Sequence, residues 1–176
     1  MKAPDGQHLT YSNGPPARME KRFILDMTVG QLAKWLRSLG FDTTIFPGKD
    51  LHRFVQVSQK EERIILTRNR RLQAKVFLGN IVIIKESQPI LQAIAVLKAL
   101  NLQVDRGKLF SRCLACNDRL EPIPHGEAEG KVPEFVFHAY RAFHRCPSCQ
   151  RIYWGGTHPK NMKKTIDEIL SSAVTP

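Results

Sequence analysis

Two Cys-x-x-Cys pairs in the last third of the chain restrict its fold more than any other feature. The pairs are Cys113-Leu-Ala-Cys116 and Cys146-Pro-Ser-Cys149, and 29 residues separate them. Each Cys-x-x-Cys turn presents two thiolates on one side, and two such turns complete the tetrahedral shell of a Zn²⁺ ion. We therefore predict that all four cysteines bind one structural zinc ion. Unligated buried cysteines are the alternative.

A small zinc ribbon is the expected fold around these cysteines, over residues 110–158. A segment of this size does not bury a sufficient core without a metal. Strand-like runs at 135–137 and 151–154 are expected to pair between the cysteine turns. Protein sulfurs fill all four metal positions, which argues against a catalytic zinc. Residues 159–176 are predicted to form a C-terminal helix and tail.

The first two thirds of the chain alternate short apolar runs with amphipathic segments. Strands are predicted over 23–26, 43–46, 63–67 and 81–84, and helices over 29–39, 51–60, 70–78 and 88–100. Fully apolar strands that alternate with helices are typical of a parallel sheet covered on both faces. We therefore predict an α/β domain over residues 21–105, followed by the small zinc ribbon.

The charge of the chain is strongly positive and unevenly distributed. The net charge is +11, from 27 basic and 16 acidic residues, and residues 1–110 contain 18 of the basic and 9 of the acidic ones. The excess of positive charge therefore belongs to the α/β domain. A polyanionic partner, most simply RNA or DNA, accounts for such a surface. A solvated surface that keeps the protein soluble is the alternative.

The N-terminal residues 1–20 contain several Pro and Gly residues and no continuous apolar stretch. They are expected to form a flexible leader rather than a secretory signal. No stretch of the chain approaches the roughly 20 apolar residues of a membrane span. We therefore expect a cytoplasmic protein without a membrane partner, in which the cysteines are reduced and available to a metal.

Polar side chains follow the predicted strands at the edge where ligands of parallel sheets gather. Asp26, Asn69 and Glu86 each lie at or just after a strand end. Carboxylates that converge there are suited to Mg²⁺, which prefers oxygen ligands, and a bound ion activates water for phosphodiester cleavage. Asp50 precedes a predicted helix, so it either caps that helix or joins the site.

Four basic residues lie beside this edge in the sequence: Arg68, Arg70, Arg71 and Lys75. Arg and Lys side chains position nucleic acids by contacting phosphate oxygens. These four residues are therefore candidates for RNA binding. A solvated helix face is the alternative.

Four segments together resemble the Mut-seven C-terminal RNase family, over residues 22–165. They read FILDMTVGQLAKWLRSLGFDT at 23–43, RIILTR at 63–68, FSRCLACN at 110–117 and CPSCQRIYWGGTH at 146–158. The resemblance implies a PIN-like nuclease domain fused to a zinc ribbon. It also implies Mg²⁺- or Mn²⁺-dependent cleavage of RNA by acidic residues at the strand ends.

Matching the family position by position assigns three candidate catalytic residues. Asp26 matches the acid of the first strand, and Asp50 matches an acid ahead of the second helix. Asn69 stands where the family has Asp after Thr-Arg. The resemblance implies that Asp26 and Asp50 hold the catalytic metal and that Asn69 assists through its carbonyl oxygen. The loss of one charge favours an alternative: a non-catalytic RNA-binding protein, docked on a ribonucleoprotein, with a degenerate nuclease site.

Overall fold

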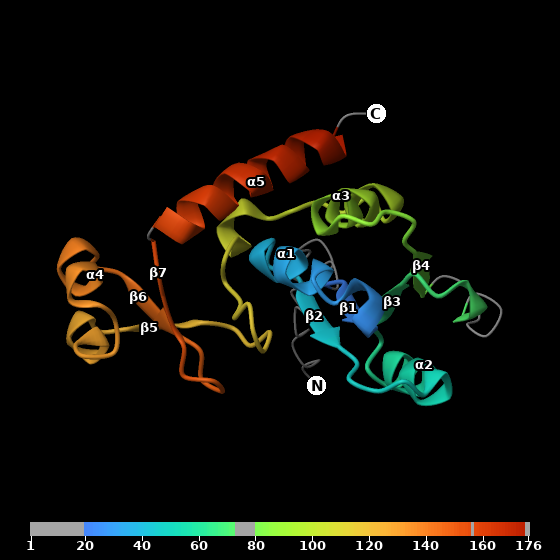
Figure 1. Ribbon diagram of the computed structural model, residues 1–176, viewed down its shortest axis with the longest axis horizontal. Coiled ribbons are helices and arrows are strands. Elements are labelled where there is room, and N and C mark those ends of the chain that lie inside the picture. Colours follow the sequence, from blue (N-terminus) through green and yellow to red (C-terminus); the bar gives the residue numbers. More distant parts are fainter. Residues whose placement is uncertain (1–19, 73–79, 156, 175–176) are drawn as a thin grey trace, which may run out of the picture.

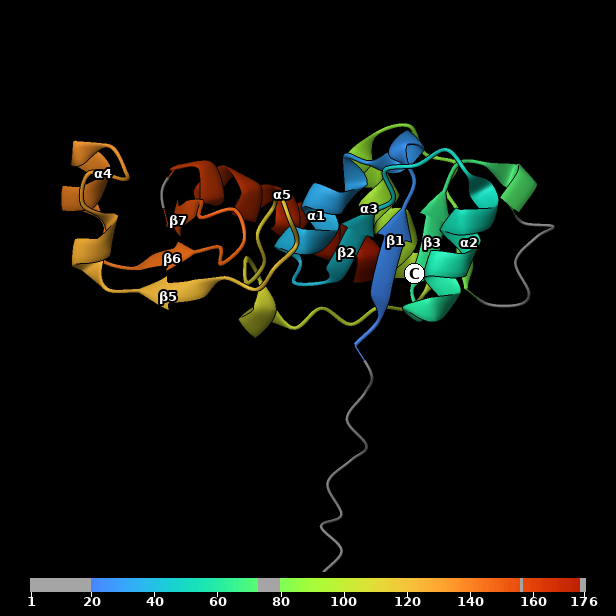
Figure 2. The same ribbon diagram turned by 90° about the horizontal axis from the view of Figure 1, so that it is seen from below.

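The computed structural model describes residues 20–72, 80–155 and 157–174. All of the expected N-terminal leader except Glu20 lies outside the described residues. So do Lys75 and the predicted helix beyond Leu72. A parallel sheet with its helices forms one end of the molecule and a smaller antiparallel sheet forms the other, as Figures 1 and 2 show. None of the described helices is long and apolar enough to cross a membrane.

The larger sheet consists of four parallel strands. They are β1 (Arg22–Leu25), β2 (Asp42–Ile45), β3 (Ile64–Thr67) and β4 (Ile81–Ile83), in the spatial order β2-β1-β3-β4. Side chains alternate between the two faces of a strand, so a strand that is apolar throughout must be covered on both sides. The predicted α/β fold with a parallel sheet is confirmed.

Helices cover both faces of this sheet. They are α1 (Leu32–Ser38), α2 (Leu51–Lys60), α3 (Pro89–Ala99) and α5 (Thr157–Val174). Phe23 and Leu25 of β1 belong to the core formed with α1, α3 and α5, whereas Ile24 packs in a separate core with Phe54 of α2. The alternation along β1 therefore supplies both cores, and α2 begins and ends at the residues predicted from the sequence.

The C-terminal helix α5 belongs to the core of the larger sheet, although it follows the ribbon in the chain. Ile166 and Ile169 are fully buried in the same cluster as Phe23. Figure 1 shows α5 lying alongside α3 and reaching from the ribbon to the sheet. The chain therefore leaves the α/β unit after α3, forms the ribbon, and returns.

The ribbon contains an antiparallel sheet of β5 (Glu121–Ile123), β6 (Phe143–Arg145) and β7 (Ile152–Trp154). The strand predicted over 151–154 is confirmed by β7, but the strand predicted over 135–137 is wrong. Those residues lie in helix α4 (Glu134–Ala139). The Pro133 carbonyl accepts the backbone N–H groups of Val136 and Phe137 at 2.9 and 3.0 Å, which begins a helical turn. Pro133 is the N-cap residue of α4, and the helical turn that begins there overrides the β propensity of the apolar run.

The ribbon is attached to the free edge of β2, the outermost strand of the larger sheet. Thr43 donates its backbone N–H to Asn117 Oδ1 at 2.8 Å, and Asn117 Nδ2 donates to Asp42 Oδ1 at 2.8 Å. Arg37 Nε donates to the Thr43 carbonyl at 2.9 Å. These side chains take the place of a neighbouring strand, so the edge of the sheet is not left unpaired.

Buried charges surround Asp42 at this junction. Arg63 contacts its Oδ1 at 2.5 Å, and Arg112 lies 3.9 Å from its Oδ2. Burial alone would raise the pKa of Asp42, but hydrogen bonds from Arg63 and Asn117 outweigh it and hold the pKa below its usual value. Arg112 Nε also donates to the Gly40 carbonyl at 3.1 Å. Gly40 has a φ of +91°, and a Cβ there would lie 2.6 Å from the Lys108 carbonyl oxygen, so only glycine fits.

Candidate active site and metal centre

Asp26 lies at the point of the larger sheet where the chain reverses its order. From β1 the chain first moves to β2 on one side and then crosses back to β3 on the other. Such a switch point opens a crevice outside the carboxyl ends of the two strands, where ligands of α/β folds bind. Asp26 directly follows β1, and Thr67 ends β3 beside it.

Both oxygens of the half-buried Asp26 carboxylate accept hydrogen bonds. Oδ1 accepts the backbone N–H of Thr28 at 2.9 Å and also the Thr28 hydroxyl, which caps the short helix η1 (Met27–Val29). Oδ2 accepts the hydroxyl of Thr67, a fully buried residue. The carboxylate is therefore held in one orientation by both strand ends.

The same two hydroxyls connect Asp26 to the residues that follow β3. Thr67 Oγ1 accepts the backbone N–H of Asn69 at 2.9 Å, and Thr28 Oγ1 accepts that of Arg68 at 3.3 Å. Thr28 and Thr67 were not among the residues predicted from the sequence. The available signal was a hydroxyl residue at the end of an apolar strand, next to a strand that ends in a candidate acid.

Asn69 and Asp50 each use a side-chain oxygen to shape the local backbone. Asn69 Oδ1 accepts the backbone N–H of Arg71 at 3.0 Å. Asp50 is exposed and caps α2, where its Oδ1 accepts the backbone N–H groups of His52 at 2.9 Å and Arg53 at 3.2 Å. These backbone hydrogen bonds, led by that from Arg53, lower the pKa of Asp50. Of the two roles considered for Asp50, the structure therefore shows the cap.

The candidate acids do not converge into one cluster in the described part of the chain. The only group there of three or more His, Cys, Asp or Glu side chains whose ligand atoms lie within 4.8 Å consists of the four cysteines. Asp26 and Asn69 are connected through Thr67, but no hydrogen bond between described residues joins Asp50 to either of them. A cation at this edge would therefore take few ligands from the protein and further oxygens from substrate or water.

Exposed basic side chains occur at the carboxyl edge of the sheet. Arg68, Arg70 and Arg71 follow β3. Lys49 follows β2 and Lys85 follows β4, so parallel pairing brings both to the same edge. None of these five side chains forms an ion pair within the described residues. Lys49 and Lys85 were not predicted from the sequence, because neither lies in a cluster of basic residues.

The four cysteine sulfurs converge between the two cysteine turns of the ribbon. The Cys113–Cys116, Cys116–Cys146 and Cys113–Cys149 sulfur separations are 3.3, 3.2 and 3.6 Å. Four sulfurs about 2.3 Å from one zinc ion stand about 3.8 Å apart, so a small expansion of this cluster accommodates the ion. None of the four forms a disulfide. The predicted ligands therefore form a site that can hold a metal ion such as zinc.

Each cysteine turn closes in the same way; we call residues 113–116 the first knuckle and residues 146–149 the second. The residue after each knuckle has a positive φ, +78° at Asn117 and +60° at Gln150. Their backbone N–H groups donate to the carbonyls of Cys113 and Cys146 at 2.9 and 3.0 Å. The two spacings seen in the sequence therefore correspond to one repeated backbone turn.

Hydrogen bonds around Cys113 favour its thiolate, the form that binds metal. Burial alone would raise its pKa, but donors that include the Tyr153 hydroxyl and the backbone N–H of Cys116 lower it to about 6. Tyr153 Oη lies 3.1 Å from Cys113 Sγ. Burial, followed by hydrogen bonds with neighbouring sulfurs, raises the pKa of Cys116. Tyr153 was also not predicted, because Cys113 is 40 residues from it in the sequence.

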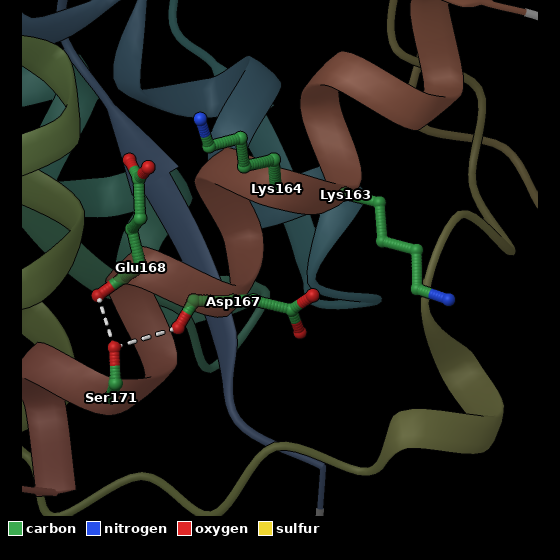
Figure 3. A pocket seen from close by; sticks show the side chains of 5 residues that line it. All are labelled: Lys163, Lys164, Asp167, Glu168 and Ser171. Atoms are coloured by element: carbon green, nitrogen blue, oxygen red, sulfur yellow. Dashed lines mark hydrogen bonds between the residues drawn. The ribbon is translucent and has the colours of Figure 1, made fainter.

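A shallow pocket lies on the exposed side of α5, away from both sites. Figure 3 shows its lining, which comes from this helix alone: Lys163, Lys164, Asp167, Glu168 and Ser171. The Ser171 hydroxyl donates to the carbonyl oxygens of Asp167 and Glu168 at 2.9 and 3.1 Å, as residues one turn apart in a helix commonly do. With all its lining on one helix face, the pocket offers no convergent set of groups for catalysis.

Comparisons with known proteins place the chain in a nuclease family. Residues 21–166 match the Mut7-C RNAse domain, a nuclease family. The chain is also similar to the exonuclease mut-7 homolog of Homo sapiens, with 39% identity over 104 residues. That alignment covers 54% of this chain and 12% of the human protein, so the chain spans a small part of that relative. No solved structure matches the chain. Because the family match covers residues 21–166, most of the chain, the chain belongs to the Mut7-C RNAse domain family.

Proposed function

We propose that this chain is a metal-dependent ribonuclease with a PIN-like domain, which cleaves RNA at the carboxyl edge of the larger sheet. The observation that carries the proposal is the Asp26 carboxylate, which Thr28 and Thr67 hold at the switch point between β1 and β3. Hydroxyls from η1 and β3 orient this acid and leave the carboxylate partly desolvated, which is a cost that packing alone does not require. Family membership supports the same chemistry.

The residues at this edge fit a hard divalent cation, Mg²⁺ or Mn²⁺, that is bound largely through its substrate. Asp26 would hold the ion, Asn69 would assist, and Asp50 would act from the α2 cap. Mg²⁺ commonly takes one or two carboxylates together with phosphate oxygens and water. Such an ion supplies an activated water and neutralises negative charge on the phosphate. Thr28 and Thr67 would keep the Asp26 oxygens oriented toward it.

RNA is the proposed partner, and the exposed basic residues would position its phosphates. They are Arg68, Arg70, Arg71, Lys49 and Lys85, and we extend the proposal to Lys75. The five described residues follow three different strands, β2, β3 and β4, so they would contact phosphates on more than one side of Asp26. Charge reversal at Arg70 and Arg71 should weaken RNA binding and flatten its salt dependence. The matched control is Lys98→Glu, because Lys98 is an exposed lysine in the last turn of α3. This substitution should change neither RNA binding nor its salt dependence.

In the ribbon, we propose that the four cysteines hold one structural zinc ion. Four thiolates leave no open position for substrate, so this ion would stabilise the fold rather than take part in cleavage. Metal analysis of freshly purified, reduced protein should find about one zinc per chain. Protein that folds without any bound metal would contradict this assignment.

A second function, a non-catalytic RNA-binding protein that associates with a ribonucleoprotein, is favoured by one observation. Asn69 stands where the family has an acid, and its Oδ1 already accepts the backbone N–H of Arg71. The site then has one negative charge fewer, which weakens the binding of a divalent cation. The two functions share the fold and the RNA surface, and they differ only in whether RNA is cut.

Cleavage of a labelled single-stranded RNA in Mn²⁺, with and without EDTA, separates the two functions. A nuclease with a weakened site should cut slowly, should stop in EDTA, and should lose activity in Asp26→Asn. Asn69→Asp should raise the rate and lower the Mn²⁺ concentration required, and each tenfold gain corresponds to about 1.4 kcal/mol of barrier. Asp105→Asn is the matched control, because Asp105 caps another short helix through Gly107 N–H at 2.8 Å.

The cleavage assays distinguish a nuclease from a non-catalytic RNA-binding protein. If RNA binds but neither the natural chain nor Asn69→Asp cleaves it at any Mn²⁺ concentration, the non-catalytic function holds. Cleavage that persists undiminished in Asp26→Asn would refute the assignment of the active site. Thr67→Val, which keeps the shape of the side chain and removes its hydroxyl, should lower the rate, and Thr67→Ser should restore most of it.

A further inference from the structure

Arg37 of α1 is a buried arginine without an acidic partner. Its side chain is 5% exposed, and it forms no ion pair within the described residues. Its guanidinium donates instead to three backbone carbonyls, those of Thr43 at 2.9 Å, Leu114 at 2.8 Å and Ala115 at 2.9 Å. A buried cation is costly unless a negative charge compensates it. The ionisable groups whose charge acts on Arg37 include Cys113 and Cys116 first, and Asp42 after them.

Two of the accepting carbonyls belong to the first knuckle. The Ala115 carbonyl is in the same peptide group as the Cys116 N–H, which donates to Cys113 Sγ at 3.5 Å. The Leu114 carbonyl is in the same peptide group as the Ala115 N–H, which also donates to the Cys113 sulfur. Each of the two peptide groups therefore has the guanidinium at its oxygen end and the sulfur at its N–H end.

This arrangement strengthens both N–H to sulfur hydrogen bonds. A cation at a carbonyl oxygen draws electron density away from the amide nitrogen and makes its N–H a better donor. Hydrogen bonds in such a chain polarise one another, and the low dielectric of a buried site increases the effect. The guanidinium also brings a positive charge close to a cluster that carries about −2 when four thiolates bind Zn²⁺.

We propose that Arg37 is a positioning residue of the zinc centre, supplied by the α/β unit rather than by the ribbon. It polarises the two peptide groups of the first knuckle toward Cys113 and compensates the charge of the thiolate cluster. Zinc affinity then depends on a residue 76 positions before the first ligand in the chain. The inference rests on the proposed structural zinc and is independent of whether the chain cleaves RNA.

The second knuckle lacks this arrangement. Backbone N–H groups of Cys149 and Ser148 donate to Cys146, so the N–H to sulfur pattern is the same. The Pro147 carbonyl, however, accepts the neutral side-chain amide of Gln150 at 2.5 Å, from within the same turn. Within the described residues, no charged side chain donates to the carbonyls of Pro147 or Ser148. The two halves of one metal site therefore provide an internal comparison of a charged and a neutral donor.

The test uses the full chain with Arg37→Met and Arg37→Lys, and Arg63→Met as the matched control. Arg63 is another buried arginine at the same junction, but it contacts Asp42, Glu61 and the Phe23 carbonyl rather than the knuckle. Zinc affinity is measured by competition with a chromogenic chelator. The Co²⁺-substituted protein is examined for its thiolate-to-metal absorption, which reports electron density on the sulfurs. Unfolding in urea reports stability separately.

Arg37→Met should weaken zinc binding about 10- to 100-fold, the usual effect of losing a residue that supports a metal ligand, and should shift the Co²⁺ absorption. Arg37→Lys keeps the charge but loses the planar guanidinium, so its zinc affinity should lie between those of Arg37→Met and the natural chain. Arg63→Met should lower stability without changing either metal readout. Zinc affinity and absorption within twofold of the natural chain in both Arg37 variants would overturn the proposal. An equal loss of affinity in Arg63→Met would also overturn it. Failure of the natural chain to bind zinc would refute the structural zinc instead.

Discussion

The first and second knuckles share one backbone turn but differ in their surroundings. Cys113 is fully buried, and the residue after this knuckle, Asn117, pairs with the edge of β2. Cys149 is exposed, and so is Gln150, the residue after the second knuckle. The same four-residue motif is therefore part of the domain junction at one position and part of the surface at the other. Residues outside the motif, such as Arg37 and Asp42, make the first knuckle part of the junction.

The difference teaches that the cysteine site and the parallel sheet are one structural unit. Asn117, directly after the first knuckle, pairs with the edge strand β2. From β2 the chain continues toward Asp50 through Phe46, whose backbone N–H donates to the Leu25 carbonyl at 2.8 Å. Loss of the metal should therefore disturb the sheet as well as the ribbon. A change at the second knuckle should disturb the sheet much less.

The largest expected effect comes from removing one ligand of each knuckle. Cys113→Ser should release zinc, unfold the ribbon and lower the melting temperature of the whole chain. Structural zinc contributes on the order of 10 kcal/mol to the folding of small zinc domains. Cys149→Ser should bind zinc more weakly but keep the junction, since water can take the exposed fourth position. Calorimetry and metal analysis check both variants. Equal losses of melting temperature and zinc in the two variants would contradict the difference between the knuckles.

The next effect is expected at Asp42, which contacts the first knuckle through Asn117. Hydrogen bonds outweigh burial and lower its pKa in the folded state. Asp42 therefore contributes stability that is fully present above the unfolded pKa of about 3.9 and is lost as the pH falls through the lower folded value. Asp42→Asn removes the anion that Arg63 and Arg112 share and leaves Arg63 with Glu61 alone, which should cost about 3 kcal/mol at pH 7.

The pH dependence distinguishes Asp42 from an exposed acid. Asp42→Asn should flatten the loss of stability with acid below about pH 4. The pKa of Asp50 is also lowered, by backbone hydrogen bonds, but Asp50 is exposed and salt should screen its contribution. Urea unfolding between pH 2 and 7, in low and high salt, separates the two. A salt-sensitive effect at Asp42 would show that the junction is more open to water than the structure indicates.

A smaller effect is expected from the residues that follow the knuckles. Asn117→Gly should destabilise the chain by about 2 kcal/mol, because the Thr43 N–H and the Asp42 carboxylate lose a partner inside the protein. Gln150→Gly should change stability by about 0.5 kcal/mol or less. Glycine tolerates the positive φ at both positions, so the comparison isolates the side-chain contacts. Urea unfolding at pH 7 measures both values.

The smallest effect is expected at the tip of the second knuckle. Ser148 is exposed, and Ser148→Lys should leave stability within about 0.5 kcal/mol and zinc content unchanged. A loss of more than about 1 kcal/mol would mean that the second knuckle packs against something, and it would remove the contrast with the first. The melting temperature and the zinc content of Ser148→Lys test this prediction.

Much of this protein could be predicted from short-range patterns in the sequence. The cluster of four cysteines follows from two local spacings, and the parallel sheet follows from apolar runs that alternate with helices. Asp26 was found because it ends an apolar strand, where ligands of such folds bind. The strand predicted over 135–137 was wrong because Pro133 started a helix there, which shows that a three-residue apolar run does not define a strand.

The tertiary structure alone decided how the two units support each other. Arg37 donates to the Leu114 carbonyl 77 residues away, and Thr67 donates to Asp26 across 41 residues. The burial of Ile166 and Ile169 beside Phe23 likewise depends on a helix that returns across the molecule. A sequence pattern reveals contacts that repeat at the period of a helix, strand or turn. A single hydrogen bond between distant segments has no period. Only the folded chain therefore shows that Thr67 orients the Asp26 carboxylate and that Arg37 contacts the carbonyls of the first knuckle.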